Sequence, residues 1–140
     1  MEERARRYRD KLNIILRRME QINEWTDIKA DEFIKDEKTK LAVYKAFQEI
    51  IESCMDIISM MCKDSKIPPK DDYTNIEEIS IRIGGINGDI LKEANGLRNV
   101  IVHRYNVIDD MRAFEAIKRI IPEIFKFVEV VEKWMKRRIK

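Results

Sequence analysis

Apolar residues recur every three or four positions along most of this chain, and this spacing places them on one face of an α-helix. The first such stripe consists of Tyr8, Leu12, Ile15, Met19 and Ile22. The last consists of Phe114, Ile117, Ile121, Ile124, Val128, Val131 and Met135. No segment alternates apolar and polar residues for long enough to predict a β-strand. The periodicity therefore indicates an all-α fold.

The segment 41–62 differs from the others because it carries two apolar stripes. One consists of Leu41, Tyr44, Gln48, Ile51, Met55, Ile58 and Cys62. The other consists of Phe47, Ile50, Cys54, Ile57 and Met61. A helix that is apolar on two sides is buried on most of its surface. We therefore expect this helix either at the centre of a bundle or between two subunits.

Polar and helix-breaking residues divide the chain into four to five helices with short connections. Pro68 and Pro69 end the helix that contains 41–62, and Gly84 and Gly85 end a short helix after it. The predicted N-terminal caps are Thr39, Thr74 or Asn75, Asp89, and Asp109 or Asp110. A polar loop is expected before the first of these caps. With 140 residues, the chain is predicted to be one domain over 1–140, folded as an up-and-down bundle.

The charges nearly cancel, with 28 Lys and Arg against 26 Asp and Glu, so net charge alone does not predict nucleic-acid binding. The basic residues are concentrated near the two ends of the chain. They are Arg4, Arg6, Arg7, Arg9, Lys11, Arg17 and Arg18, and then Lys133, Lys136, Arg137, Arg138 and Lys140. We interpret them as solvated helix faces, with a basic rim for RNA phosphates as the alternative.

The start of the chain and its cysteines indicate a cytoplasmic protein. No apolar leader follows the initial Met-Glu-Glu-Arg, and no apolar run is long enough to span a membrane. Cys54 and Cys62 lie eight residues apart on one predicted helix, too far for a disulfide, and are expected to be reduced core thiols. One histidine and two separated cysteines make no zinc-type cluster, so we expect no metal and no cofactor.

The only histidine, His103, belongs to a motif R-N-x3-H-x-Y that begins at Arg98. On a helix over residues 89–105, Asn99 shares a face with His103, so its amide can hydrogen-bond the imidazole. Arg98 and Tyr105 lie on the adjacent face. This arrangement would place a permanently charged guanidinium beside a group that titrates near neutral pH.

These residue types suit RNA cleavage without a metal ion. A neutral His103 can take the proton from a ribose 2′-OH, and Arg98 can stabilise the charge that builds on the attacked phosphate. The departing 5′-oxygen also needs a proton, which a second histidine in a homodimer would supply. Two alternatives remain open: a cleft that binds RNA, a nucleotide or a protein partner without cutting, and a His103 that only packs in the apolar core.

The motif and its surroundings resemble the HEPN superfamily, and more narrowly the HepT-like toxins. The motif of those toxins is R-x4-H-x-Y on the penultimate helix of an all-α bundle. The matching features are Gly96, Arg98, Asn99, the apolar residues 100–102, His103, Tyr105 and Asp109. Chain length and helix order are also similar.

The resemblance implies a role for each residue of the motif. Arg98 and His103 match the catalytic pair, and Asn99 matches the polar residue that commonly follows the arginine. Tyr105 matches the tyrosine to which MNT-type nucleotidyltransferase antitoxins add AMP, which silences the toxin. The resemblance also implies a homodimer whose two motifs face a shared cleft. We therefore expect a metal-independent endoribonuclease of a toxin–antitoxin pair, with RNA as its substrate, or alternatively a non-catalytic helical dimer using the same cleft.

Overall fold

Six α-helices and one 3₁₀ helix build the computed structural model, which describes residues 2–138. Their bounds are α1 (Glu2–Trp25), α2 (Ala30–Lys35), α3 (Glu37–Asp64), α4 (Asp72–Arg82), α5 (Gly88–His103), η1 (Tyr105–Val107) and α6 (Asp110–Arg138). No strand occurs in the described part of the chain, so the all-α prediction is confirmed, as is the position of Arg98, Asn99 and His103 on the penultimate α-helix. The predicted basic residue Lys140 lies outside the described residues.

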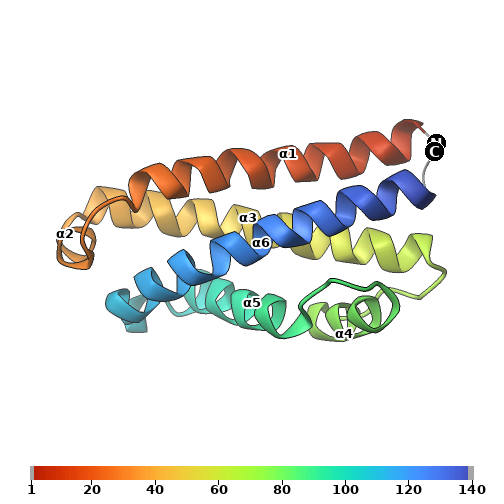
Figure 1. Ribbon diagram of the computed structural model, residues 1–140. Helices are drawn as coiled ribbons and strands as arrows, with labels where there is room; N and C mark the ends of the chain where they lie inside the picture. Colours follow the sequence, from red (N-terminus) through yellow and green to blue (C-terminus); the bar gives the residue numbers. More distant parts are fainter. Residues whose placement is uncertain (1, 139–140) are drawn as a thin grey trace.

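The helices form an up-and-down bundle of four rods (Figure 1). The long helices α1, α3 and α6 make three rods, and α4 and α5 lie end to end as the fourth. The helix that was not predicted is α2, which replaces the expected polar loop. Its Phe33 is fully buried and packs edge-on against the ring of Tyr44 and at a tilt against that of Phe114, and this residue anchors the segment to the bundle.

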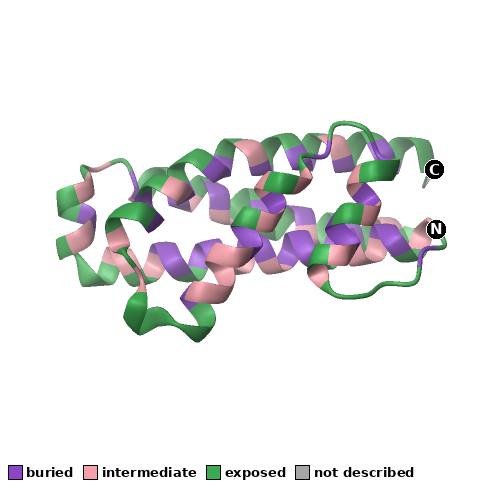
Figure 2. Cartoon of the chain, turned by 90° about the horizontal axis from the view of Figure 1, so that it is seen from below, coloured by how far each residue is buried: buried purple, intermediate pink, exposed green. Residues whose placement is uncertain are grey.

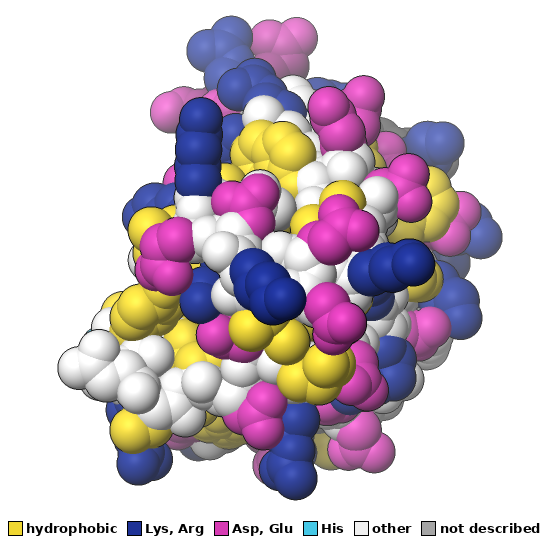
Figure 3. Space-filling view, turned by 90° about the vertical axis from the view of Figure 1, so that its left-hand side faces the viewer, with side chains coloured by type: hydrophobic (Ala, Val, Ile, Leu, Met, Phe, Trp, Pro, Cys, Tyr) yellow, Lys and Arg dark blue, Asp and Glu magenta, His cyan; other side chains and the backbone are white. Residues whose placement is uncertain are grey.

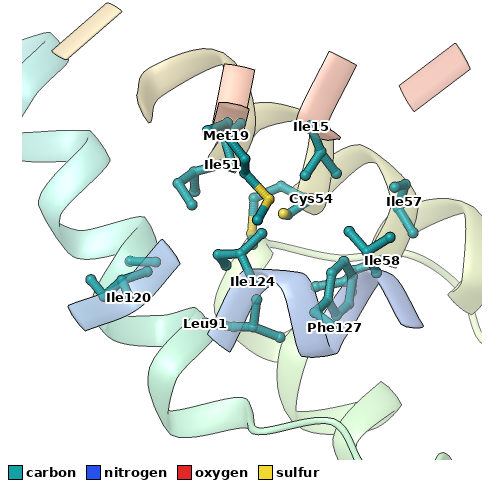
Figure 4. Close-up of a cluster of buried hydrophobic side chains, with 14 of the residues drawn as sticks. Ile15, Met19, Ile51, Cys54, Ile57, Ile58, Leu91, Ile120, Ile124 and Phe127 are labelled. Carbon is teal, nitrogen blue, oxygen red and sulfur yellow. The ribbon is translucent and has the colours of Figure 1, made fainter. Parts of the chain in front are cut away.

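The predicted stripes form the core, and buried residues line the facing sides of the helices (Figure 2). Every residue of the α1 and α6 stripes is buried. Both stripes of α3 are buried as well, apart from Leu41 and Gln48 at their edge. Figure 4 shows side chains from four helices meeting, namely Ile15 and Met19, Ile51, Cys54, Ile57 and Ile58, Leu91, and Ile120, Ile124 and Phe127. The α3 helix is therefore the centre of the bundle, and both of its cysteines are free and buried as predicted.

The predicted caps Thr39 and Thr74 are wrong by one turn. The α3 helix is capped by Asp36, whose carboxylate accepts from the backbone N–H of Thr39 (3.1 Å). The α4 helix is capped by Asp71, which accepts from the N–H of Thr74 (2.9 Å). Each threonine hydroxyl donates to the same cap carboxylate. The threonines are thus partners of the caps, because an aspartate three residues earlier satisfies the free N–H groups of the first turn.

The remaining predicted caps, for α4, α5 and α6, have different outcomes. Asn75, the alternative cap for α4, is buried within that helix. Its Oδ1 accepts from the backbone N–H of Lys70 and its Nδ2 donates to the Lys70 carbonyl, and these two bonds close the α3–α4 loop. The α5 helix is capped by Asn87 rather than Asp89. For α6, Asp109 accepts from the N–H of Arg112 (3.2 Å), as predicted.

The core makes a testable prediction about α3. Ile57→Val should lower the free energy of unfolding by about 1 kcal/mol, because the removed methyl leaves a small cavity among fully buried neighbours. Ile81→Val is the matched control, since Ile81 on α4 is 83% exposed and should change stability by less than about 0.5 kcal/mol. Urea unfolding of both variants measures the difference. Equal losses would contradict the central position of α3.

None of the described helices combines the length and the apolarity needed to cross a membrane.

Candidate active site at the end of α5

The motif helix ends earlier than predicted. The α5 helix stops at His103, because Arg104 leaves the helical conformation (φ −136°, ψ 39°) after its N–H bonds the carbonyl of Val100 (2.8 Å). The β-branched residues 100–102 favour helix only weakly. The predicted helical position of Tyr105 is therefore wrong. Tyr105 starts η1, and its ring contacts α3 instead.

His103 is exposed at the end of α5. It lies in an open hollow of about 340 Å³ that is lined by residues 102–107, including Tyr105. This exposure overturns the alternative in which His103 only packs in the core. The predicted bond from Asn99 is absent, and within residues 2–138 the imidazole of His103 has no hydrogen-bond partner. The ring is therefore accessible to a substrate.

Arg98 points toward carboxylates of two other helices. Its Nη2 donates to Oδ1 of the buried Asn95 (3.0 Å) and to Oδ2 of Asp72 (3.3 Å). Its Nη1 lies 3.7 Å from Oε2 of Glu52. The Arg98 side chain is only 16% exposed, and its buried Nε has no partner. Contacts from α3, α4 and α5 thus hold the guanidinium in one orientation.

The two residues of the predicted catalytic pair are therefore not joined within one chain. No hydrogen bond between Arg98 and His103 is found in the described residues, although both lie on α5. Glu52 and Asp72 balance the charge of Arg98. A phosphate that binds Arg98 has to take over part of this pairing.

Tyr105 contacts two residues of α3. Its hydroxyl donates to Oε1 of Glu37 (3.3 Å), and its ring packs edge-on against Tyr44. Burial and the nearby negative charge of Glu37 raise the pKa of the Tyr105 hydroxyl. The positive charge of Lys40 offsets part of this rise in pKa. The hydroxyl is therefore protonated at neutral pH.

Basic residues near the N-terminal end of the chain form several separate ion pairs. On α1, Arg4 pairs with Asp64, Lys11 with Asp56, and Arg18 with Glu49. Figure 3 shows the opposite end of the molecule, where α2 lies, and positive and negative side chains alternate there. The ion pairs on α1 favour a solvated helix face over a continuous basic rim for this helix. Across residues 2–138, no group of three or more His, Cys, Asp or Glu side chains is placed to share a metal ion.

Comparisons of the sequence point to ribonucleases. The family model "Ribonuclease HepT-like" matches residues 15–131. A protein of Archaeoglobus fulgidus that is named as a candidate RNase is 33% identical over 135 residues, which cover 92% of this chain and 93% of that protein. The tRNA nuclease HepT of Aphanizomenon flos-aquae is 24% identical over 131 residues, which cover 89% and 87% of the two chains.

The fold is also similar to a solved structure. A tri-AMPylated HEPN toxin of Shewanella oneidensis, in complex with MNT antitoxin, superimposes with a TM-score of 0.82 at 20% sequence identity. The match covers 91% of this chain and 97% of that toxin. At this identity the similarity establishes the fold alone. The helix order described above is thus that of the HEPN fold.

Proposed function

Because this chain belongs to the HepT-like ribonuclease family, we propose that it is a toxin that cuts RNA through Arg98 and His103 without a metal ion. The observation that carries the proposal is the exposed His103, which lies in the open hollow at the end of α5. A core histidine would have no access to RNA. The RNase names of the two relatives support RNA as the substrate class.

The chemistry proceeds by internal attack of the ribose. His103 takes the proton of a 2′-OH, and the 2′-oxygen attacks the adjacent phosphorus. The bond to the 5′-oxygen breaks, which leaves a 2′,3′-cyclic phosphate and a 5′-OH. Arg98 offers guanidinium N–H groups to the phosphate oxygens while negative charge builds on them. We also propose a supporting role for Asn99, the polar residue that follows Arg98 on α5.

A second copy of the chain completes this site. One chain holds a single histidine, so the departing 5′-oxygen lacks a proton donor of its own. In the proposed homodimer the two hollows meet, and the second His103 protonates that oxygen. Val102 and Val107 flank His103 and are 38% and 64% exposed. They supply apolar surface at the place where the two copies would meet.

Silencing acts on the same hollow. An MNT-type nucleotidyltransferase antitoxin adds AMP to Tyr105, a proposal supported by the AMPylated state and the MNT antitoxin of the structural neighbour. Tyr105 lines the hollow with His103. An AMP group there adds bulk and a phosphate anion that attracts Arg98, and both effects exclude RNA.

A non-catalytic binding module is the second candidate function. The observation that favours it is the pairing of Arg98 with Glu52 and Asp72, because a guanidinium held by two carboxylates can be purely structural. Such a module would still bind RNA, a nucleotide or the nucleotidyltransferase through the exposed hollow.

The test is incubation of the purified protein with RNA in excess EDTA. We expect cleavage that leaves 2′,3′-cyclic phosphate ends, because the proposed reaction needs only side chains of the protein. End-group analysis of the fragments by mass spectrometry provides the measurement. Intact RNA after incubation with a folded protein would contradict the enzyme and favour the binding module.

A further inference from the structure

Tyr105 is one of five side chains, from three segments, that form a closed ring of contacts. The Tyr105 hydroxyl donates to Oε1 of Glu37 (3.3 Å), and Oε2 of Glu37 lies 3.4 Å from Nζ of Lys40. Lys40 donates to Oδ2 of Asp110 (3.0 Å), and the other Asp110 oxygen accepts from the Tyr44 hydroxyl (2.5 Å). The Tyr44 ring then packs edge-on against Tyr105, with centroids 6.1 Å apart at 78°.

The ring of contacts fixes Tyr105 at both ends of its side chain. Tyr44 sets the position of the aromatic ring, and Glu37 sets the direction of the hydroxyl. Both partners of that hydrogen bond remain accessible, since Tyr105 is 37% exposed and the Glu37 side chain is 67% exposed. Exposed polar contacts of this kind contribute little to stability. They do, however, present an oriented hydroxyl to another protein.

The hydroxyl needs a proton acceptor in order to react. Its raised pKa keeps it protonated at neutral pH, and a protonated phenol is a weak nucleophile. Glu37 is the carboxylate that already accepts its hydrogen bond, within the reach required of a general base in an unliganded structure. Lys40 contacts the other oxygen of Glu37 and is itself held by Asp110, so the carboxylate stays in place.

We propose that Glu37 is the proton acceptor when Tyr105 is adenylylated, an inference that rests on the proposed silencing of this protein by a nucleotidyltransferase. The Tyr105 oxygen attacks the α-phosphorus of ATP and forms an O–P bond. The bond from that phosphorus to pyrophosphate breaks, and pyrophosphate leaves with the electron pair. The hydroxyl proton passes to Oε1 of Glu37. Lys40 is a positioning residue for this step. The toxin thereby supplies one catalytic group for its own silencing.

The test is Glu37→Gln, which keeps the size of the side chain and an acceptor oxygen but cannot take the proton. Rates of AMP incorporation are measured with radiolabelled ATP and an MNT-type nucleotidyltransferase over a range of toxin concentrations. We expect kcat to fall about 100-fold with little change in KM for the toxin. Glu115→Gln is the control: it removes one exposed carboxylate of α6 that has no described hydrogen bond or ion pair, and it should be modified at the wild-type rate.

The outcomes separate this inference from the proposed function. Wild-type protein that is never modified, in an assay with active nucleotidyltransferase, overturns the proposed silencing. Modification of the wild type together with an unchanged kcat for Glu37→Gln, or with a change in KM alone, overturns only the role of Glu37. Circular dichroism checks the fold. If Glu37→Gln does not fold, Glu37→Asp keeps the negative charge at the start of α3, and its shorter side chain should still lower kcat; an unchanged kcat would then overturn the proposal.

Discussion

His103→Ala should reduce RNA cleavage by at least about 10²–10⁴-fold, the contribution typical of a general base, because in the proposed homodimer it also removes the proton donor for the 5′-oxygen. The imidazole is the only group of its kind in the chain, so no neighbour can replace it. Stability should change little, because the side chain is exposed at the last position of α5 and has no described hydrogen bond. Initial rates in excess EDTA and the thermal midpoint of the same preparation provide the two measurements.

The pair of measurements distinguishes three roles for His103. Loss of cleavage with an unchanged thermal midpoint supports catalysis. Loss of both would indicate a structural role, which the exposed position of the ring argues against. Cleavage by His103→Ala at the wild-type rate would show that another group removes the 2′-OH proton.

The fold was predictable because burial follows the helical period so closely. In α1 and α6, every residue of the predicted stripes is buried. The double stripe of α3 predicts a helix either at the bundle centre or between subunits, and the structure places it at the centre. The exceptions are Leu41, which is 48% exposed near the start of α3, and the half-buried Gln48. The segment containing α2 was predicted as a loop because its helix is only six residues long and has one buried anchor, Phe33. A single apolar residue produces no periodicity.

The ends of the helices were harder to predict than their existence. In Asp36-x-x-Thr39 and Asp71-x-x-Thr74, both the aspartate and the threonine are good cap residues. In each case the aspartate is the cap, because its carboxylate accepts from both the backbone N–H and the hydroxyl of the threonine. Competition of this kind shifts a helix start by one turn, which sequence spacing alone does not resolve.

The motif gave the candidate residues but not their partners. Glu37, Glu52 and Asp72 lie 26 to 68 positions from the motif residues they contact. Their contacts depend on how α3 and α4 pack on α5, which no local pattern encodes. In the sequence they are three of 26 acidic residues. The early end of α5 at His103 brings Tyr105 against Tyr44 of α3, another long-range contact that local spacing does not encode.

Arg98→Lys should lower RNA cleavage by about 10²–10³-fold, even though it keeps the positive charge. The guanidinium contacts three acceptors on α3, α4 and α5 at once, and its planar fork can also hold two phosphate oxygens. A lysine ammonium is a point charge on a flexible stem, so it loses both the fixed orientation and the paired contact. The initial cleavage rate in EDTA is the measurement.

Arg112→Lys provides the control for this prediction. Arg112 is 89% exposed on α6 and pairs only with Asp109 in the described structure, so its replacement should leave the cleavage rate unchanged. Urea unfolding of Arg98→Lys measures the stability lost when Glu52, Asp72 and the buried Asn95 face an ammonium group in place of the guanidinium. Wild-type cleavage by Arg98→Lys would mean that charge alone is needed at this position. The orientation imposed by the two carboxylates would then serve the fold and not the reaction.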